Sequence, residues 1–400
     1  MISVAEAIRI IREQTEALPV ETVALADVLG RVLAEDIVAD SDLPPFDRAQ
    51  MDGYAVRSAD TLNVPARLRV VGESAAGRGW HERMKPGEAV RIMTGAPVPD
   101  GADSVQKVEV TSESGRVVEI AETTQTGQFI TKRATEISAG ETVLQVGDEI
   151  NAAMMAALAS FGYAEVKVRR RPRVAVLATG TELVRVNEKP VADQIRDSNS
   201  YSLGAYAQLA GALVERLPLA GDDPEILKRE IADAATRNDV LILSGGVSMG
   251  VYDFTKLALS ELDAEIFFER VSLRPGKPTV FARIGDALVF GLPGNPVSVS
   301  VTFNLFARTA LRAMQGCKDA QMIEEWAVLE RGVKGAVERA SYLPAQLQTN
   351  TEGQLLAQPL KWGGSSDFVA FARATALIIV PEGVRSLDAG TKVHVVRLPG

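Results

Sequence analysis

The chain has very few residues that could ligate a soft metal or act as a histidine base. Its 400 residues include one cysteine, Cys317, and two histidines, His81 and His394, which lie far apart in the sequence. A single cysteine excludes a disulfide framework within the chain, and zinc sites built from Cys and His need more of these ligands than the chain has. A histidine-based nucleophilic triad is disfavoured for the same reason.

Excess positive charge and long apolar runs are also lacking. The 52 acidic residues outnumber the 43 basic ones, for a net charge of −9. This excess of negative charge excludes a diffuse positive field that could hold nucleic acid by neutralising its phosphates. Any anion must therefore be bound by a few groups at one site. No stretch of about 18 apolar residues occurs, and the first residues do not form a signal peptide. We expect a cytoplasmic protein that binds neither membrane nor nucleic acid.

Short periodic segments predict regions of different character along the first part of the chain. Ser3, followed three residues later by Glu6, is typical of a capped helix, and the apolar spacing after it predicts an amphipathic helix. A short strand is expected at 22–26, and the two prolines at 44–45 predict a boundary because proline fixes φ and lacks an amide donor. The β-like runs between turn residues from 54 to 137 predict a small all-β domain.

The pattern changes in the second part of the chain. A compact helix is expected at 152–162, a strand at 164–168 and a solvated hinge in the basic run 169–173. From 173 to 316 buried apolar runs alternate with helical segments, which predicts a doubly wound parallel α/β sheet. Short alternating strands return from about 320, and their spacing predicts a small β-barrel or sandwich.

Three glycine-containing segments fall at expected carboxyl ends of the α/β strands, where such sheets bind ligands. They are VLATGTE (176–182), LILSGGVSMGVYD (241–253) and FGLPGNPVS (290–298). Glycine turns can point backbone N–H groups into one concavity, and the helix starts that follow add partial positive charge. A Gly-Gly pair can also be only a tight turn, but three such loops on one edge predict a shared anion pocket.

Charged residues near these loops predict how the pocket handles its ligand. In the turn VSLRPGKP (271–278), Arg274 and Lys277 are expected to hold a phosphate or an oxyanion. Glu182, Asp197 and Asp253 lie at or near helix starts, where each could be only a cap or first-turn residue. Together they favour a hard cation such as Mg²⁺ that bridges to a phosphate.

Seven ordered segments resemble the molybdopterin molybdenumtransferase family, whose relatives include the C-terminal domain of gephyrin. They are DRAQMDGYAV (47–56), IMTGAP (92–97), TGTEL (179–183), DSN (197–199), SGGVSMGVYD (244–253), RPGKP (274–278) and GLPGNPVS (291–298). The resemblance implies a multidomain α/β plus all-β protein that forms an elongated homodimer. Its parts would be a segmented N-terminal, dimerising helical/β region (1–45 and 138–168), a small β domain (46–137), a molybdopterin-binding α/β domain (169–318) and a C-terminal β-barrel (319–400).

The same resemblance implies a reaction and a set of site residues. Molybdenum from molybdate would enter adenylylated molybdopterin in a Mg²⁺-dependent step that releases AMP, at a site formed across the dimer interface. The preceding adenylyltransferase and the recipient molybdoenzymes would be partners. The family's catalytic positions correspond to Asp52, Thr94, Glu182, Asp197, Asp253, Pro293 and Pro296, with Glu182, Asp197 and Asp253 as Mg²⁺ ligands. Substrate- and anion-binding positions correspond to Asn199, Ser244, Gly245, Gly246, Ser248, Arg270, Arg274, Lys277, Pro278, Ser298, Arg339 and Ser365.

At two of these positions, residue spacing alone does not predict the catalytic role that the resemblance implies. Asp52 and Thr94 each lie beside a glycine turn, and from spacing we would interpret both as structural. Arg270 and Arg274 stand where relatives often have lysine, which keeps the charge but changes the donor geometry.

Two hypotheses from other functional classes remain open. One is a non-catalytic scaffold, as the gephyrin domain is when it binds receptor peptides. The other is a hydrolase of phosphorylated nucleotides built on the same α/β domain. The scaffold would not need the acidic residues, and the hydrolase would need neither the segment around Asp52 nor the C-terminal barrel.

Overall fold

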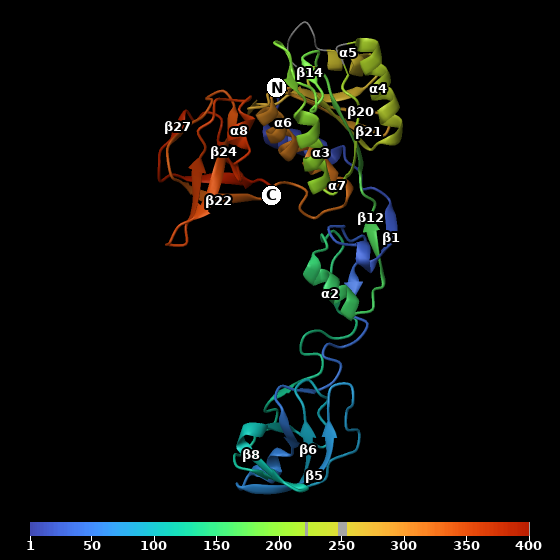
Figure 1. Ribbon diagram of the computed structural model, residues 1–400, viewed down its shortest axis with the longest axis vertical. Helices are drawn as coiled ribbons and strands as arrows, with labels where there is room; N and C mark the ends of the chain where they lie inside the picture. The colour runs from blue at the N-terminus through green and yellow to red at the C-terminus, as the bar shows by residue number, and fades with distance from the viewer. Residues whose placement is uncertain (221–222, 247–253, 400) are drawn as a thin grey trace. The chain divides into compact units, whose positions relative to one another are not determined.

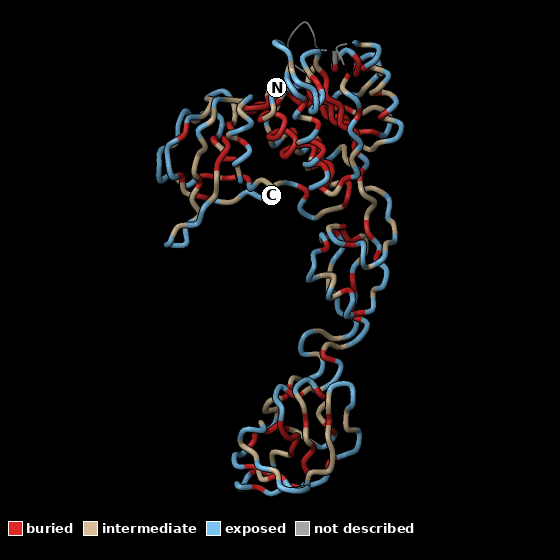
Figure 2. The backbone as a smooth tube through the Cα atoms, viewed as in Figure 1, coloured by how far each residue is buried: buried red, intermediate tan, exposed pale blue. Residues whose placement is uncertain are grey.

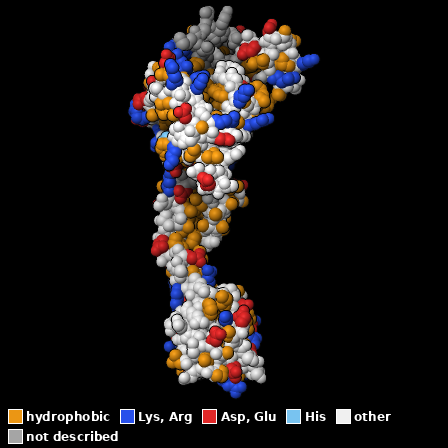
Figure 3. Space-filling model, turned by 90° about the vertical axis from the view of Figure 1, so that its left-hand side faces the viewer, with side chains coloured by type: hydrophobic (Ala, Val, Ile, Leu, Met, Phe, Trp, Pro, Cys, Tyr) orange, Lys and Arg blue, Asp and Glu red, His pale blue; other side chains and the backbone are white. Residues whose placement is uncertain are grey.

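The computed structural model describes residues 1–220, 223–246 and 254–399 and divides the chain into two compact units (Figure 1). The larger unit contains Met1–Glu35, Gly147–Asn151 and Glu165–Gly400, and the smaller unit contains Asp36–Val146 and Ala152–Ala164. Each unit has its own buried core (Figure 2). No helix in the described ranges is long and apolar enough to cross a membrane. Figure 3 shows lysine and arginine side chains scattered among acidic and uncharged ones on the face of the larger unit that it presents.

The larger unit begins with the helix that the sequence predicts. Helix α1 (Val4–Glu13) starts where Ser3 Oγ accepts a hydrogen bond from the backbone N–H of Glu6 at 3.1 Å. The Glu6 carboxylate binds Arg9. Ala7 and Ile11 are fully buried in the main hydrophobic core, so the apolar stripe docks the helix onto the rest of the unit.

A six-stranded sheet lies at the centre of the larger unit. Its strand order is β16 (Leu213–Arg216), β13 (Arg173–Ala178), β17 (Val240–Ser244), β21 (Ala287–Leu292), β20 (Pro278–Ile284) and β18 (Glu265–Arg270). The first four strands are parallel, as predicted, but β20 is antiparallel to β21, and β18 is antiparallel to β20. The prediction of a wholly parallel sheet is therefore wrong at one edge. Only Gly285 and Asp286 separate β20 from β21, and parallel strands need a much longer crossover.

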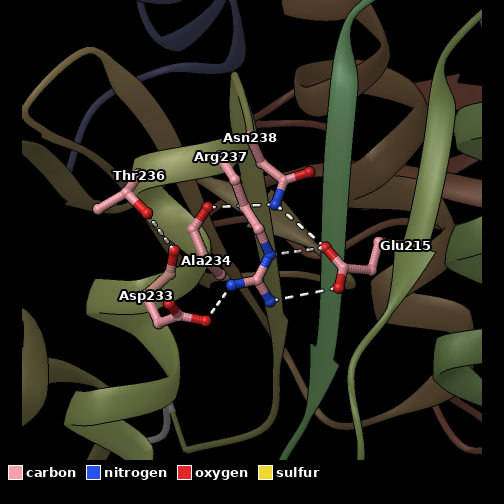
Figure 4. A network of polar contacts seen from close by, with 6 residues as sticks. All are labelled: Glu215, Asp233, Ala234, Thr236, Arg237 and Asn238. Carbon is pink, nitrogen blue, oxygen red and sulfur yellow. Dashed lines mark hydrogen bonds and ion pairs between the residues drawn. The ribbon is translucent and has the colours of Figure 1, made fainter.

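Helices cover both faces of this sheet. On one face α3 (Asn199–Leu209), α6 (Pro296–Thr302) and α7 (Arg308–Met314) contribute to the same core as α1, and a π-helical segment, Phe303–Ala307, joins α6 to α7. On the other face α4 (Pro224–Arg237) and α5 (Phe254–Glu261) cover a second apolar cluster. At the end of α4, Arg237 donates to Glu215 of the edge strand β16 at 3.2 Å and also binds Asp233 (Figure 4). The contact with Glu215 joins α4 to the sheet edge, and the contact with Asp233 lies within the helix.

The C-terminal part of the larger unit is a closed barrel, which decides between the two architectures expected there. Its five strands are β24 (Ala340–Thr349), β25 (Leu355–Pro359), β22 (Glu324–Leu329), β28 (Lys392–Arg397) and β26 (Ala376–Val380). The barrel closes because β26 also pairs with β24. The short strand β19 (Leu273–Arg274) pairs with β24 and so connects the α/β part to the barrel. The remaining elements here are β23 (Val333–Lys334), β27 (Ser386–Leu387) and the short helix α8 (Phe368–Phe371).

The larger unit also contains a short parallel pair, β14 (Leu183–Val184) with β15 (Ile195–Arg196), a two-stranded ribbon and the basic run. Strand β1 (Val20–Ala24) begins two residues before its expected start and pairs with β12 (Glu165–Arg169). Arg170 donates to both carboxylate oxygens of Asp239, at 2.9 and 2.7 Å, and this pairing raises the pKa of Arg170. Arg169 donates to the Leu18 carbonyl at 2.9 Å. The basic run is thus tied into the fold, and the prediction of a solvated hinge is wrong.

The smaller unit is mainly β-structure, as predicted. Its sheet has the order β7 (Ser104–Lys107), β4 (Gly53–Val56), β6 (Glu88–Ile92), β5 (Ala66–Ser74), β9 (Val117–Ile120) and β8 (Thr111–Ser114). Strand β7 ends at Lys107, and the chain continues as a 3-10 turn, Val108–Val110. Short pairs join β2 (Ile37–Val38) to β11 (Thr142–Leu144) and β3 (Arg48–Ala49) to β10 (Ile130–Thr131), and the expected helix is α2 (Ala152–Ser160).

Candidate functional site

A cleft of about 1000 Å³ opens at the carboxyl ends of β13, β17 and β21, where the sequence predicted ligand binding. We call it the strand-end cleft, and it lies wholly within the larger unit. Residues expected at the site that line it are Glu182, Asp197, Asn199, Ser244, Gly245, Gly246, Pro278, Pro293 and Pro296. Ser248 and Asp253, also expected here, lie outside the described residues.

Glycine is required at the end of β17 because two other chain segments approach it closely. Gly245 and Gly246 have φ values of +98° and +63°. A Cβ atom at Gly245 would lie 2.4 Å from the Thr179 carbonyl oxygen, and one at Gly246 would lie 2.5 Å from Thr255 Oγ1. The Gly-Gly pair therefore makes a tight turn and also leaves room on the cleft side.

Asn199, the first residue of α3, ties together the loops that form the cleft. Its Nδ2 donates to Ser244 Oγ at 2.9 Å and to the Gly294 carbonyl at 2.7 Å. Both amide hydrogens are used, while Asn199 Oδ1 is buried and has no partner among the described residues. Thr179 Oγ1, also on the cleft, is buried and unpartnered in the same part of the chain.

The two described carboxylates of the cleft differ in how much of their bonding capacity is already used. Asp197 is 6% exposed, and its oxygens accept hydrogen bonds from the Ser200 backbone N–H, at 3.0 Å, and from the Ser200 hydroxyl. The interpretation of Asp197 as a helix-start residue is thus confirmed, and its role as a metal ligand stays a prediction. Glu182 is exposed at the cleft. Within the described ranges no group of three His, Cys, Asp or Glu side chains is placed to hold a metal ion.

The third loop is joined to the barrel half of the chain by hydrogen bonds. Helix α6 begins at Pro296, and the Asn295 side chain makes no capping bond but donates to Ser365 Oγ at 3.0 Å. The Ser365 carbonyl accepts from the Val297 N–H at 3.0 Å. That N–H of the helix start is therefore not available to an anion. Ser298 is only 4% exposed, so its side chain lies inside the protein.

Arg274 lies away from the strand-end cleft, at a second cleft of about 360 Å³ that we call the barrel cleft. Arg274 lines it together with Lys334, Trp362 and Gly364. Arg339 lies beside this turn because its Nη1 donates to the Leu273 carbonyl at 3.4 Å.

The other residues of the cationic turn follow from the direction of β20. Because β20 is antiparallel to β21, its first residue, Pro278, reaches the strand-end cleft. Arg270 is half-buried opposite Pro278 in the β18–β20 pair, and Lys277 is half-buried beside it. The turn therefore runs along both clefts.

Asp52 and Thr94 lie in the smaller unit and are in direct contact. Asp52 Oδ1 accepts from the Thr94 backbone N–H at 2.6 Å and from the Thr94 hydroxyl at 2.7 Å. These two bonds hold the pKa of Asp52 below its ordinary value, the backbone N–H contributing most. The neighbouring Gly53 is required because a Cβ there would lie 1.9 Å from the Gln106 carbonyl oxygen. Spacing suggested two separate structural residues, whereas the fold makes them a pair.

Comparisons with known proteins agree with this architecture over nearly the whole chain. Residues 2–162 match the MoeA N-terminal region (domain I and II), residues 175–313 a probable molybdopterin-binding domain, and residues 327–398 the MoeA C-terminal region (domain IV). The chain is 37% identical over 402 residues to the molybdopterin molybdenumtransferase of Bacillus subtilis, covering 98% of this chain and 93% of that protein. The chain belongs to the molybdopterin molybdenumtransferase family.

Other members of the molybdopterin molybdenumtransferase family are comparably similar. The Staphylococcus aureus protein of that name is 35% identical over 401 residues, covering 99% of this chain and 95% of its own. Two crystal structures of molybdopterin biosynthesis MoeA protein from Pyrococcus horikoshii superpose over 100% of both chains, with TM-scores of 0.84 and 0.86 and identities of 32% and 27%.

Sequence reasoning missed several residues of the strand-end cleft in this family member. Thr179, Asn295, Ser366 and Phe368 line it, and none of them was among the expected site residues. For Thr179 a signal was present, because it is the first polar residue after the buried strand β13. Ser366 and Phe368 come from the barrel half of the chain, which contacts the cleft through Ser365, bonded to Asn295 and Val297, and through Ser366, whose hydroxyl donates to Asn295 Oδ1 at 3.4 Å.

Proposed function

We propose that this protein transfers molybdenum from molybdate to adenylylated molybdopterin, with Mg²⁺, and releases AMP and molybdenum cofactor. The observation that carries the proposal is the composition of the strand-end cleft. Five of the seven family segments contribute to its lining, through Glu182, Asn199, Ser244, Pro278 and Pro293. Segments separated by more than a hundred residues in sequence thus supply one cavity, which is large enough for a nucleotide-sized ligand.

The carboxylates of this cleft fit a magnesium ion that is shared with substrate. Mg²⁺ is usually bound through one or two carboxylates plus substrate phosphates and water. Glu182 presents an exposed carboxylate, and the Asp197 oxygens retain lone pairs beyond those used by Ser200. When bound, the ion would neutralise charge on the phosphoryl group whose bond to molybdopterin is broken. Asp253 is our third proposed ligand.

The barrel cleft supports binding of molybdate near that reaction. Arg274 lines it, and Arg339 lies beside the same turn. A guanidinium group binds oxyanions through a planar fork of N–H donors, and charge-assisted bonds of this kind are stronger than neutral ones. We assign molybdate to the barrel cleft and the phosphates to the strand-end cleft.

We further propose that the chain acts as a homodimer whose active site takes residues from both protomers. A mixing experiment tests this directly. Asp52→Ala and Glu182→Ala protomers, each inactive alone, should regain part of the activity when co-refolded, because one site of the heterodimer would then be intact. Failure to regain activity, with heterodimer formation shown by mass spectrometry, would contradict a shared site. The preceding adenylyltransferase would supply the substrate, and recipient molybdoenzymes would accept the product.

The main test is a product assay with the purified full chain. With adenylylated molybdopterin, molybdate and Mg²⁺, AMP should appear together with cofactor that activates a molybdenum-free apoenzyme, and chelation of Mg²⁺ should stop both. Release of AMP without cofactor would instead indicate a hydrolase, and release of neither would favour a scaffold. Arg274→Ala should raise the molybdate concentration that is needed, whereas Arg331→Ala, whose guanidinium binds the Pro359 carbonyl on the barrel, should not.

A further inference from the structure

We infer that a third cleft, lined by four arginines, binds a tetrahedral oxyanion such as phosphate, sulfate or molybdate. This cleft has a volume of about 390 Å³ and lies wholly within the larger unit. We call it the arginine cleft, and it shares no lining residue with the strand-end cleft or the barrel cleft. The inference therefore goes beyond the proposed function. The charged residues that line the arginine cleft are Glu21, Asp27, Arg31, Arg170, Arg171 and Arg173.

Two of these arginines are held in place by the protein. Arg31 is only 6% exposed, and its Nη2 binds the Glu21 carboxylate and donates to the Arg169 carbonyl at 2.8 Å. Arg170 donates to both carboxylate oxygens of Asp239, at 2.9 and 2.7 Å. Their positions are fixed without any ligand, so their positive charge is a permanent feature of the cleft.

The other two arginines have donors to spare. The guanidinium groups of Arg171 and Arg173 line the cleft and make no hydrogen bond or ion pair with any described residue. Arg171 is half-buried and Arg173 is exposed, so an ion from solvent can reach both. The backbone N–H of Arg173 donates to Asp239 at 2.7 Å, which fixes the main chain from which this side chain extends. Each guanidinium group presents a planar fork of N–H donors that matches two oxygens of an oxyanion.

The charges around the arginine cleft do not cancel. Its four arginines outnumber the two carboxylates in the lining, and they still outnumber the acids when Asp239, the partner of Arg170, is included. This local excess occurs in a protein whose net charge is −9. Guanidinium groups gathered in one small cleft repel one another, and a bound anion offsets that repulsion. The cleft is thus a local site for an anion on a protein that is negatively charged as a whole.

The lining favours a small oxyanion over a nucleotide. A volume of about 390 Å³ is near the lower end of the range for ligand sites. Leu213 is the one apolar residue that lines the cleft among the described residues, and the lining contains no aromatic ring on which a base could stack. Chloride lacks the paired oxygens that a guanidinium fork binds, so a tetrahedral oxyanion is expected to bind more tightly.

Equilibrium binding to the full-length protein tests the inference without turnover. The probes are phosphate, sulfate and molybdate, measured by calorimetry in sodium chloride buffers of constant ionic strength. Because the barrel cleft is itself proposed to bind an oxyanion, all measurements use Arg274→Ala as the background. In that background, Arg171→Gln/Arg173→Gln should weaken binding about tenfold or more, since it removes hydrogen bonds from charged donors. Arg171→Lys/Arg173→Lys keeps the charge without the fork and should give an intermediate affinity.

An acidic residue of the lining allows a test in the opposite direction. Asp27 is exposed in the cleft, and its carboxylate makes no hydrogen bond or ion pair with a described residue. Asp27→Asn removes a charge that repels the anion, so it should strengthen binding by about two- to fivefold. The matched control is Arg385→Gln, which removes the charge of an exposed arginine that does not line the cleft. That change should leave oxyanion affinity unaltered.

Thermal unfolding separates binding from a structural role. Without oxyanion, Arg171→Gln/Arg173→Gln should have the Tm of its background or a higher one, because the lost groups have no acceptor and repel their neighbours. Added phosphate should raise the Tm of the background protein and not that of this variant. If the Gln variant failed to fold, the Lys variant and Asp27→Asn would still decide the matter.

Each outcome decides for or against the arginine cleft. Oxyanion affinity that falls with Arg171→Gln/Arg173→Gln and rises with Asp27→Asn would uphold it, and the tightest of the three probes would identify the ion. Unchanged affinity, an equal loss in Arg385→Gln, or binding that chloride reproduces would overturn it. AMP release by the Gln variant in an otherwise wild-type chain should be normal. Absence of AMP release from every protein would contradict the proposed reaction and leave the arginine cleft standing.

Discussion

Asp197 in the larger unit and Asp52 in the smaller unit accept hydrogen bonds from the same two kinds of donor, but they differ in burial and in which oxygens accept. Each carboxylate receives one bond from a backbone N–H and one from the hydroxyl of the same residue, Ser200 or Thr94. At Asp197 the two bonds are spread over both oxygens of a buried carboxylate. At Asp52 both fall on Oδ1, and the residue is exposed.

Acidic residues of the family segments can thus have the same kinds of donor and still differ in what their substitution changes. The bonds of Asp197 stabilise the start of α3, so its substitution affects folding as well as chemistry. The bonds of Asp52 orient a carboxylate whose Oδ2 makes no hydrogen bond to any described residue. Asp52 Oδ2 is therefore able to accept a further bond, and we expect the two residues to respond differently to the same changes.

The largest effect is expected from Asp52→Ala. Positioned acid or base groups contribute about 100-fold or more to rate, so AMP release should fall by at least that factor while Tm changes little, because the side chain is exposed. The measurement pairs a rate assay with thermal unfolding. Asp60→Ala is the control, since Asp60 only accepts a bond from the Gly87 N–H within the same unit. If Asp52→Ala proved as active as the wild type, Asp52 would have no part in the site.

Asp197→Ala is expected to change stability as well as rate. Loss of the helix-start acceptor and of the partner of the Ser200 hydroxyl should lower the free energy of unfolding by about 1–3 kcal/mol, measured by urea denaturation. Asp197→Asn retains an oxygen for the Ser200 N–H and removes the charge. A stable but inactive Asn variant would assign the charge a role in the reaction, and an active one would make Asp197 purely structural.

A smaller effect is expected from Thr94→Val, which removes one of the two bonds to Asp52. The backbone N–H remains, so Asp52 should keep its place while its pKa rises toward the ordinary value. We expect AMP release to fall by about three- to tenfold and Thr94→Ser to recover it. Carbon-detected NMR of the Asp52 carboxyl group gives the pKa directly. An unchanged pKa in the Val variant would mean that the hydroxyl does not stabilise the charge.

The smallest effect is on the pH dependence of the smaller unit. Because the pKa of Asp52 is lower in the folded protein, the stability that its bonds contribute is fully present above the unfolded value of about 4. It is lost as the pH falls through the lower, folded value. Unfolding followed between pH 3 and 7 should therefore show a Thr94-dependent component only at the acidic end. A component that appears between pH 5 and 7 would point to another group.

Local patterns predicted much of the fold, and strand direction and distant contacts account for what they missed. The start of α1 and the alternation of strands and helices after residue 173 follow from local patterns, but the antiparallel β20 was overlooked although Gly285 and Asp286 form a two-residue connection. The sequence did not distinguish a barrel from a sandwich. Closure of the barrel depends on the pairing of β24 with β26, and no residue pattern within either strand indicates that pairing.

In the candidate site, too, contacts between residues near in sequence could be predicted and contacts between distant residues could not. The bonds of Asp197 at the start of α3 are local, since Ser200 is three residues away, and the sequence offered a helix-start role as one of two interpretations. The Asp52–Thr94 contact joins residues 42 positions apart, and it exists because β4 pairs with β6, with Gly53 opposite Ile92. The separation of Arg274 from the strand-end cleft likewise follows from the pairing of β19 with β24.

The sequence by itself determined the family segments, the alternation of strands and helices, the helix starts and the scarcity of soft ligands, because these depend on residue chemistry and on backbone preferences over a few positions. Tertiary structure alone decided that Asp52 meets Thr94, that Arg274 lines a different cleft from Glu182 and Asp197, and that Thr179 and Asn199 keep unpartnered oxygens among the described residues. Those outcomes depend on which distant segments pack together, and that is set by the burial of the whole chain and not by any one stretch of it.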